Sequence, residues 1–119
     1  MTAAIFLYGT LLDPRVLERM AGRRGLARRL RSARLPGYRR VALRGTPYPT
    51  LLWNPRAATD GAVLRLGPAA MARLGAYEGA LYRLRPVRVL TRRGRAWARA
   101  WMAEPRGADR PRDWPPPPR

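Results

Sequence analysis

The sequence predicts one α+β domain, in which short helices flank a small, mixed but mostly antiparallel, β-barrel-like sheet. Two observations lead to this fold class. The chain has 119 residues, of which 46% are hydrophobic, and this is enough to bury one core. Roughly six short segments have the apolar or alternating pattern of strands, and two have the pattern of short helices.

The first third of the chain predicts a strand, a helix and an ambiguous segment. Residues 3–8 are an apolar run, which is typical of a buried strand. Asp13 is placed to cap a helix, Pro14 suits the first helical position, and Gly22 ends the helix. The apolar residues between positions 26 and 35 follow neither the spacing of a helix nor the alternation of a strand well. We expect an edge strand there, with an amphipathic helix as the alternative.

Turn residues divide the middle of the chain into three further strands. Pro36-Gly37 marks a turn before a strand at residues 38–43. Residues 50–53 form another strand, and a turn at Asp60-Gly61 precedes a strand at residues 62–66.

A helix and a hairpin complete the predicted domain. The helix runs from Pro68 to the glycine at position 79, which breaks it. Residues 81–90 and 96–102 alternate between apolar and polar positions, which predicts a hairpin. Trp97 and Trp101 share one face of its second strand, and we expect both in the core.

The last segment differs in composition from the rest. Residues 104–119 contain many prolines and little apolar surface to bury, which predicts an extended or disordered tail. The domain itself would span residues 1–103. A proline-rich tail of this kind could also be a ligand for another protein.

Composition narrows the possible chemistry. The chain has no cysteine and no histidine, which excludes disulfides, thiolate chemistry and the commonest general base. A proton transfer must therefore use one of the seven carboxylates, a tyrosine or water. The carboxylates form no convincing set of metal ligands, so we expect neither a metal nor a cofactor.

The net charge of +18 suggests nucleic acid as a partner. All 25 basic residues are arginines, however, and this bias is typical of GC-rich codon usage. The aromatic residues are not interleaved with arginines, and Trp97 and Trp101 are assigned to the core. We therefore expect no nucleic-acid partner, and prefer a basic surface that steers acidic substrates.

No segment is apolar enough to span a membrane, and the first four residues lack the layout of a signal peptide. We therefore expect a cytoplasmic protein without a membrane partner. A flat apolar face of the sheet could support a homodimer.

The segment Tyr8-Gly9-Thr10-Leu11 is the first candidate for a functional site. It follows a buried strand, where a glycine allows close approach and exposed amides can bind an oxyanion or a carboxylate. Thr10 adds a hydroxyl and Tyr8 a phenol. The alternative is a tight turn with Tyr8 in the core.

Glu78 is the second candidate. It ends a helix among small and aromatic residues, so the helix dipole and the loss of water would both raise its pKa. Such a carboxylate is suited to general-base catalysis near neutral pH. The alternative is a surface Glu78 paired with Arg83 or Arg85. Other acids have simpler explanations, with Asp13 as a helix cap and Asp60 as a turn residue.

Several motifs occur together in one order along the chain. They are Phe6 to Leu11, Gly37-Tyr38, Tyr48-Pro49, Asp60-Gly61-Ala62-Val63, and Tyr77-Glu78-Gly79-Ala80-Leu81-Tyr82-Arg83. In this order they resemble the γ-glutamylcyclotransferase-like family, also called the avirulence-induced-gene-like family. The resemblance covers residues 4–103 approximately, and its most specific part pairs the Tyr-Gly-Thr-Leu element with the later Tyr-Glu-Gly-x-x-Tyr element.

The resemblance implies a small mixed barrel with a substrate loop at Tyr8 to Leu11 and a catalytic acid/base at Glu78. Tyr82 would line the pocket. The implied reaction closes a γ-glutamyl group into 5-oxoproline and releases an amine or amino acid, without a cofactor. Members act on γ-glutamyl amino acids, γ-glutamylamines or γ-glutamyl-protected intermediates. Gly75 departs from the family, in which an acidic residue often stands at this place.

A non-catalytic basic module on the same fold is the alternative function. It would bind nucleic acid or a protein partner through the arginines between Arg15 and Arg44. Binding to nucleic acid would then depend steeply on salt.

Overall fold

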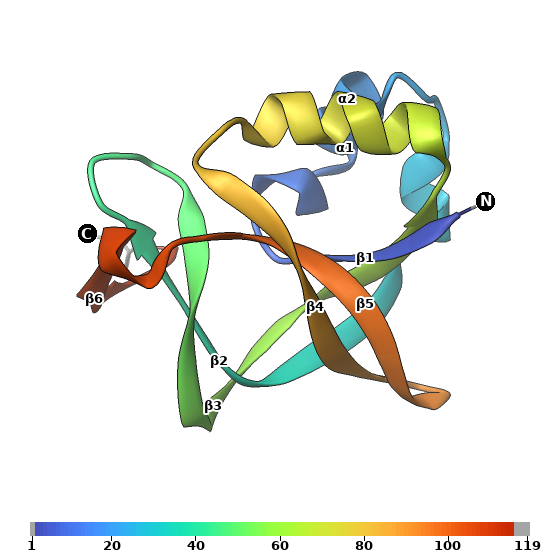
Figure 1. Cartoon of the computed structure of the whole chain (residues 1–119). Coiled ribbons are helices and arrows are strands. Elements are labelled where there is room, and N and C mark those ends of the chain that lie inside the picture. The colour runs from blue at the N-terminus through green and yellow to red at the C-terminus, as the bar shows by residue number, and fades with distance from the viewer. Residues whose placement is uncertain (1, 116–119) are drawn as a thin grey trace.

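The computed structural model describes residues 2–115, and its sheet closes into a five-stranded barrel (Figure 1). The strands follow one another in the order β3-β1-β5-β4-β2, and pairing between β2 and β3 closes the ring. The sixth strand, β6, pairs with β2. Strands β1 and β5 are parallel, whereas the other described pairs are antiparallel. The strands are β1 (Ala3–Leu7), β2 (Arg31–Leu43), β3 (Pro49–Leu66), β4 (Tyr82–Thr91), β5 (Gly94–Ala103) and β6 (Ala108–Asp113).

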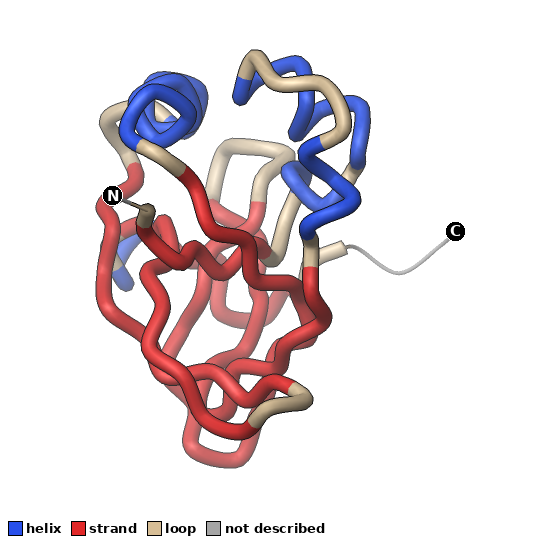
Figure 2. Tube along the Cα trace, turned by 90° about the vertical axis from the view of Figure 1, so that its right-hand side faces the viewer, coloured by secondary structure: helices blue, strands red, loops and turns tan. Residues whose placement is uncertain are grey.

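Two α-helices lie together on one side of the barrel, above it in Figure 1, and Figure 2 shows the same separation from the side. They are α1 (Pro14–Ala21) and α2 (Pro68–Glu78), and three short 3₁₀ helices, η1 (Thr10–Leu12), η2 (Leu26–Arg29) and η3 (Pro105–Gly107), complete the described elements. The predicted α+β class, with a barrel-like sheet and short flanking helices, is confirmed. Among residues 2–115, no helix has the length and apolar character needed to cross a membrane.

Strand β1 contributes to two apolar cores because its side chains alternate between its faces. Ile5 and Leu7 pack beneath the helices, in a cluster that also contains Trp101. Phe6 and Tyr8 point into the barrel, in a second cluster. The loop that follows β1 is therefore anchored from both sides.

The predicted signals for both helices are confirmed. The Asp13 carboxylate accepts a hydrogen bond of 2.9 Å from the Arg15 amide, and Pro14 is the first residue of α1. Gly22 ends that helix with a left-handed backbone, φ 69°. Helix α2 begins at Pro68 and stops before the glycine at position 79. The hairpin of β4 and β5 is also where the sequence predicts it.

The prediction of a turn at Pro36-Gly37 is wrong, because both residues lie inside β2. The pairing register between β2 and β3 shifts between Pro36 and Tyr38, and Gly37 has φ 85°. Proline and glycine therefore mark a bulge in a continuous strand here, and the bulge lets the long strand bend around the barrel.

The prediction of a turn at Asp60-Gly61 is also wrong, since β3 runs unbroken through both residues. Gly61 is needed because β1 passes very close to it. A Cβ atom at this position would stand 2.2 Å from the Leu7 carbonyl oxygen and 2.8 Å from Cζ of Phe6. The glycine signal thus reflects the close approach of two backbones.

The ambiguous segment at residues 26–35 divides into two elements. Residues Leu26–Arg29 form η2, and the rest begins β2. The expectation of an edge strand is wrong, because β2 pairs with β3, β4 and β6. Neither period fits the whole segment because it contains the junction between the two elements.

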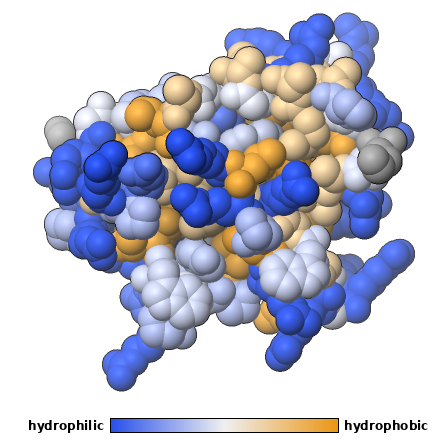
Figure 3. Space-filling view, viewed as in Figure 1, coloured by the Kyte–Doolittle hydropathy of each residue, from blue (hydrophilic) through white to orange (hydrophobic). Residues whose placement is uncertain are grey.

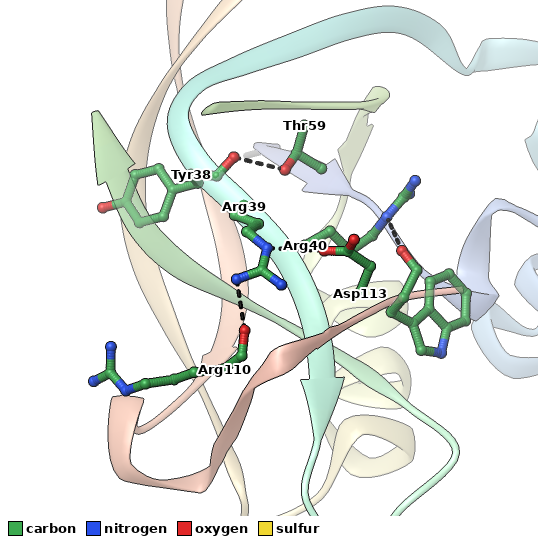
Figure 4. A network of polar contacts seen from close by, with 7 residues as sticks. Tyr38, Arg39, Arg40, Thr59, Arg110 and Asp113 are labelled. Atoms are coloured by element: carbon green, nitrogen blue, oxygen red, sulfur yellow. Dashed lines mark hydrogen bonds and ion pairs between the residues drawn. The ribbon is translucent and has the colours of Figure 1, made fainter. Parts of the chain in front are cut away.

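The segment predicted as a tail contains a strand of the sheet. Strand β6 pairs with β2, and Ala108 is buried in a small apolar cluster with Val41. Arg39 fixes the strand through Nε, 2.8 Å from Asp113 Oδ1, and through Nη1, 2.6 Å from the Arg110 carbonyl oxygen (Figure 4). These contacts attach β6 despite its low apolar content. Residues 116–119, the end of the predicted tail, lie outside the described residues.

Trp97 and Trp101 lie on one face of β5, as the sequence predicts, but only Trp101 is in the core. Trp101 is 6% exposed and packs beneath the helices. Trp97 is 65% exposed, so its assignment to the core is wrong. The alternation of the strand determines the face of a side chain, whereas burial depends on how far the helices extend over that face.

Replacing Gly75 with alanine is expected to stabilise the protein by about 0.5–1 kcal/mol, because glycine is a poor helix former. Gly75 lies within α2, and an added Cβ would meet no atom within 4 Å. Denaturant unfolding measures the change. The matched control is Gly79→Ala, which should destabilise the protein because Gly79 has φ 79°. A loss of stability in Gly75→Ala would contradict the expectation.

Candidate active site

A cavity opens where β1 ends, below the last turn of α2. Its wall combines the loop after β1, the end of α2, the start of β3 and the first residue of β4. The cavity is lined by Phe6, Leu7, Tyr8, Gly9, Thr10, Leu11, Tyr48, Pro49, Tyr77, Glu78, Tyr82 and Trp101. All six candidate site residues, Tyr8, Gly9, Thr10, Leu11, Glu78 and Tyr82, are therefore brought together.

The loop after β1 presents backbone donors at this cavity. The Leu12 and Asp13 amides donate to the carbonyl oxygens of Gly9 and Thr10, at 3.0 and 3.1 Å. Within residues 2–115, no acceptor is found for the amides of Gly9, Thr10 and Leu11. The first amides of a helical turn have no partner inside that turn, so they remain free for an anionic group.

Gly9 is placed against the opposite wall of the cavity. A Cβ atom on Gly9 would stand 2.8 Å from Cγ of Pro49. The contact holds the loop close to the start of β3, and no larger residue fits there without displacing one of the two. The glycine at this position thus has a steric reason.

Tyr8 lines the cavity and is also part of the core, so both alternatives considered for it from the sequence apply. Its side chain is 6% exposed, its ring stacks with Phe6, and its hydroxyl donates to the Trp101 carbonyl oxygen. Burial raises the pKa of Tyr8 well above its usual range, and nearby Tyr82 and Glu78 add to this effect. Tyr8 therefore stays protonated and forms a fixed wall of the cavity.

Glu78 is half-buried at the end of α2 and faces the cavity. Burial raises its pKa from 4.5 to about 7. In the described part of the chain it forms no ion pair and no side-chain hydrogen bond, so the alternative pairing with Arg83 or Arg85 is absent there. Glu78 can thus exchange a proton near neutral pH.

Two hydrogen bonds connect the walls of the cavity. The Tyr82 hydroxyl donates to the Pro49 carbonyl oxygen at 2.7 Å. Thr10 Oγ1 and the Tyr77 hydroxyl lie 2.9 Å apart, within hydrogen-bond distance. Burial, followed by the charge of Glu78, raises the pKa of Tyr82 far above its usual value. The Tyr82 hydroxyl therefore stays protonated, whereas the raised pKa of Glu78, about 7, lets that carboxyl group titrate near neutral pH.

The family model described as "Gamma-glutamyl cyclotransferase, AIG2-like" matches residues 5–116, which is nearly the whole chain. The chain belongs to this family. The match includes β6 and extends beyond the sequence-based domain boundary at residue 103.

Solved structures agree with this family assignment. An Arabidopsis thaliana protein with a solution structure is 26% identical, with TM-score 0.73, covering 89% of this chain and 74% of its own. A structure called "Gamma-glutamyl cyclotransferase" is 17% identical, with TM-score 0.72, covering 87% of this chain and 68% of its own. An AIG2-like Mus musculus protein is 15% identical, with TM-score 0.61 and coverages of 87% and 78%. A search of curated proteins gave no match.

The structure adds cavity residues that the sequence analysis did not assign to the site. Tyr77 directly precedes Glu78 and lies in the last turn of α2. Tyr48 lies between two prolines, and the second of them, Pro49, is the first residue of β3. Both residues lie within motifs on which the family resemblance depends, and this was the available signal.

A network on the outside of the barrel supports the same cavity. Arg40 on β2 donates through Nη1 to the Tyr8 carbonyl oxygen at 2.9 Å, and through Nε to the Trp114 carbonyl oxygen at 3.0 Å. The Arg40 guanidinium also lies 5.5 Å from the centre of the Trp114 ring. Trp114 Nε1 donates to the Pro47 carbonyl oxygen at 2.8 Å. The end of the described chain thus joins the loop after β1 to the wall at Tyr48.

Proposed function

We propose that this family member is a γ-glutamylcyclotransferase-type enzyme, which converts a γ-glutamyl group into 5-oxoproline and releases an amine or amino acid. One observation carries the proposal. Glu78, whose pKa is raised to about 7, lines the same cavity as residues 9–11, whose amides have no acceptor within residues 2–115. A proton acceptor and an anion-binding loop in one cavity suit acyl transfer.

Ring closure can proceed with Glu78 as the only titrating group. The Glu78 carboxylate removes a proton from the α-ammonium group of the substrate. The freed amine attacks the γ-carbonyl carbon, a carbon–nitrogen bond forms, and a tetrahedral oxyanion results. This intermediate collapses by breaking the bond to the original amine, to which Glu78 returns the proton. The ring nitrogen loses its second proton as the lactam forms, and the released amine takes up that proton and leaves as an ammonium ion. The products are 5-oxoproline and one amine, and water is not consumed.

The loop amides of Gly9, Thr10 and Leu11 would stabilise charge in this reaction. They can hold the oxyanion of the intermediate or the α-carboxylate of the substrate. No arginine side chain lines the described wall of the cavity, so the donors available to an anion there are these amides and the hydroxyl groups of residues such as Thr10 and Tyr77. The reaction requires few other protein groups, because the nucleophile and the electrophile belong to one substrate molecule. The protein only has to hold that molecule in the folded conformation that brings them together.

Among residues 2–115, no group of three or more acidic side chains is arranged to hold a metal ion.

A substrate panel tests the proposal. γ-Glutamyl amino acids and γ-glutamylamines are incubated with the protein, and 5-oxoproline is measured together with the released amine. We expect equal amounts of the two products from at least one compound. The α-glutamyl isomers are the matched controls and should give none, because their leaving amine is not on the γ-carbonyl. If no γ-glutamyl compound forms 5-oxoproline, the proposal is wrong.

Replacing Trp114 with alanine is expected to lower kcat/KM about tenfold, since small shifts of positioning groups are costly in catalysis. The loss of the indole removes the support of both Arg40 and the Pro47 carbonyl. Steady-state kinetics measure the effect. Trp114→Phe retains a ring beneath Arg40 and loses only the bond from Nε1, so it should recover part of the activity. Wild-type kinetics in Trp114→Ala would show that the network does not support the site.

A further inference from the structure

We propose that a second site, separate from the cavity at Glu78, binds single-stranded nucleic acid. This site is a cleft between the start of β2, the end of β3 and the turn of the β4–β5 hairpin. Ala4, near the start of β1, belongs to its wall, whereas the cavity at Glu78 lies beyond the end of that strand. Five arginines line the cleft, and we call them the arginine cluster: Arg31, Arg65, Arg92, Arg93 and Arg95.

The arginine cluster concentrates positive charge in a cleft where no described acidic side chain neutralises it. All five side chains are exposed, and no aspartate or glutamate lines the cleft. The ion pairs found within residues 2–115 involve other arginines, namely Arg34, Arg39, Arg106 and Arg112. Codon usage explains why the basic residues are arginines rather than lysines. It does not explain why five of them line a cleft that has no described acidic side chain. A bound polyanion would relieve the mutual repulsion of the cluster.

An exposed indole stands at the same cleft. Trp97 lines it and is 65% exposed, and the Arg88 guanidinium lies 5.4 Å from the centre of its ring. An exposed aromatic ring beside guanidinium groups is a platform on which a base can stack. One reason for expecting no nucleic-acid partner was the assignment of Trp97 to the core, and the exposure of Trp97 shows that this assignment is wrong.

The pairing of guanidinium groups with an indole favours a nucleic acid over an acidic peptide. Guanidinium forks bind phosphate in a bidentate manner, and a flat base is the natural partner for Trp97. A single strand is required because the bases of a duplex are already stacked inside the helix. Figure 3 shows hydrophilic side chains projecting around one face of the molecule, in keeping with a strongly charged surface.

Binding of a labelled oligo-dT of about 12 nucleotides, followed by fluorescence anisotropy over a range of salt, tests this proposal. The test variant is Arg92→Gln, Arg93→Gln and Arg95→Gln together. The matched control changes three exposed arginines near the helices, Arg15, Arg19 and Arg23, to glutamine. Both variants lose the same net charge, so only the position of the charge differs.

We expect the variant in the arginine cluster to bind at least about tenfold more weakly and to lower the salt slope by about 2. The control should change affinity by less than about threefold. Trp97→Phe should abolish most of the quenching of protein fluorescence by the oligonucleotide, while the other tryptophans remain.

Three outcomes would overturn the proposal. In the first, the wild-type protein does not bind the oligonucleotide. In the second, both triple variants weaken binding equally, which would indicate that the oligonucleotide binds to the positive charge of the whole surface rather than to this cleft. In the third outcome, a poly-glutamate peptide competes as well as the oligonucleotide, so that the ligand class is wrong. Release of 5-oxoproline should be unchanged in the variant of the arginine cluster, because this site does not depend on the proposed function.

Discussion

Replacing Glu78 with glutamine is expected to reduce 5-oxoproline release by about 10²–10⁴-fold, the usual contribution of a general acid or base. Glutamine has the same shape but cannot accept the proton of the substrate's α-ammonium group. The measurement is steady-state turnover of the best γ-glutamyl substrate. Because the amide oxygen of glutamine can still accept a hydrogen bond from the α-ammonium group, KM should change less than kcat. If the turnover of Glu78→Gln is close to that of the wild type, Glu78 is not the acid/base of the reaction.

The pH dependence of the reaction gives an independent check on Glu78. Its pKa of about 7 means that the carboxylate becomes available as pH rises through neutrality. We expect kcat/KM of the wild-type protein to increase on the acidic side with an apparent pKa near this value. The residual activity of Glu78→Gln should lack this limb. A rate that is already maximal near pH 5 would contradict the raised pKa.

Stability should distinguish loss of chemistry from loss of fold. The pKa of Glu78 is raised on folding, from 4.5 to about 7, so the folded protein binds the proton more tightly than the unfolded chain. The wild type therefore loses stability as pH rises from about 4.5 to about 7, and Glu78→Gln does not. At about pH 8 the variant should be about 1–3 kcal/mol more stable in denaturant unfolding. A destabilised variant would indicate a structural role.

Replacing Gly61 with alanine is expected to destabilise the protein by about 3 kcal/mol, a large effect for one methyl group. The added Cβ would stand 2.2 Å from the Leu7 carbonyl oxygen, which belongs to the backbone of β1. A flexible side chain could move aside at small cost, but here β1 and β3 must separate. Denaturant unfolding at equilibrium measures the loss of stability.

The same substitution at Gly75 serves as the control for this experiment, because the added methyl group there meets open space. The two variants differ only in the surroundings of one methyl group. Gly61→Ala should also impair catalysis, since Leu7 leads directly into the loop at the cavity. A stability within about 1 kcal/mol of wild type would show that β1 and β3 are not as close as described.

Elements with local signals were predictable from the sequence. Asp13, Pro14 and Gly22 act within a few residues of one another, so their pattern specifies α1 completely. Gly37 and Gly61 were misinterpreted because the same residue types mark turns and also bulges or close backbone contacts. Which of these applies depends on a strand far away in the chain, and β1 lies more than fifty residues before Gly61.

In the candidate site, too, local signals were predictable from the sequence and contacts between distant parts of the chain were not. Glu78 could be singled out because the chain lacks histidine and the other acids had simpler roles, and the family resemblance joined it to the loop at Tyr8. The partner of the Tyr8 hydroxyl is the Trp101 carbonyl, 93 positions later, and Arg40 binds Trp114 across 74 positions. These contacts depend on closure of the barrel and on β6, which no local pattern indicates.

Product analysis in oxygen-18-labelled water tests the central claim most directly. In an intramolecular aminolysis, water takes no part in breaking the γ-glutamyl bond. We therefore expect unlabelled 5-oxoproline and one equivalent of amine from the wild-type protein, and at least about a hundredfold less of both products from Glu78→Gln in the same time. Free glutamate carrying one labelled γ-oxygen would show that the cavity activates water instead, and would contradict the account of Glu78 as the acid/base of a cyclisation.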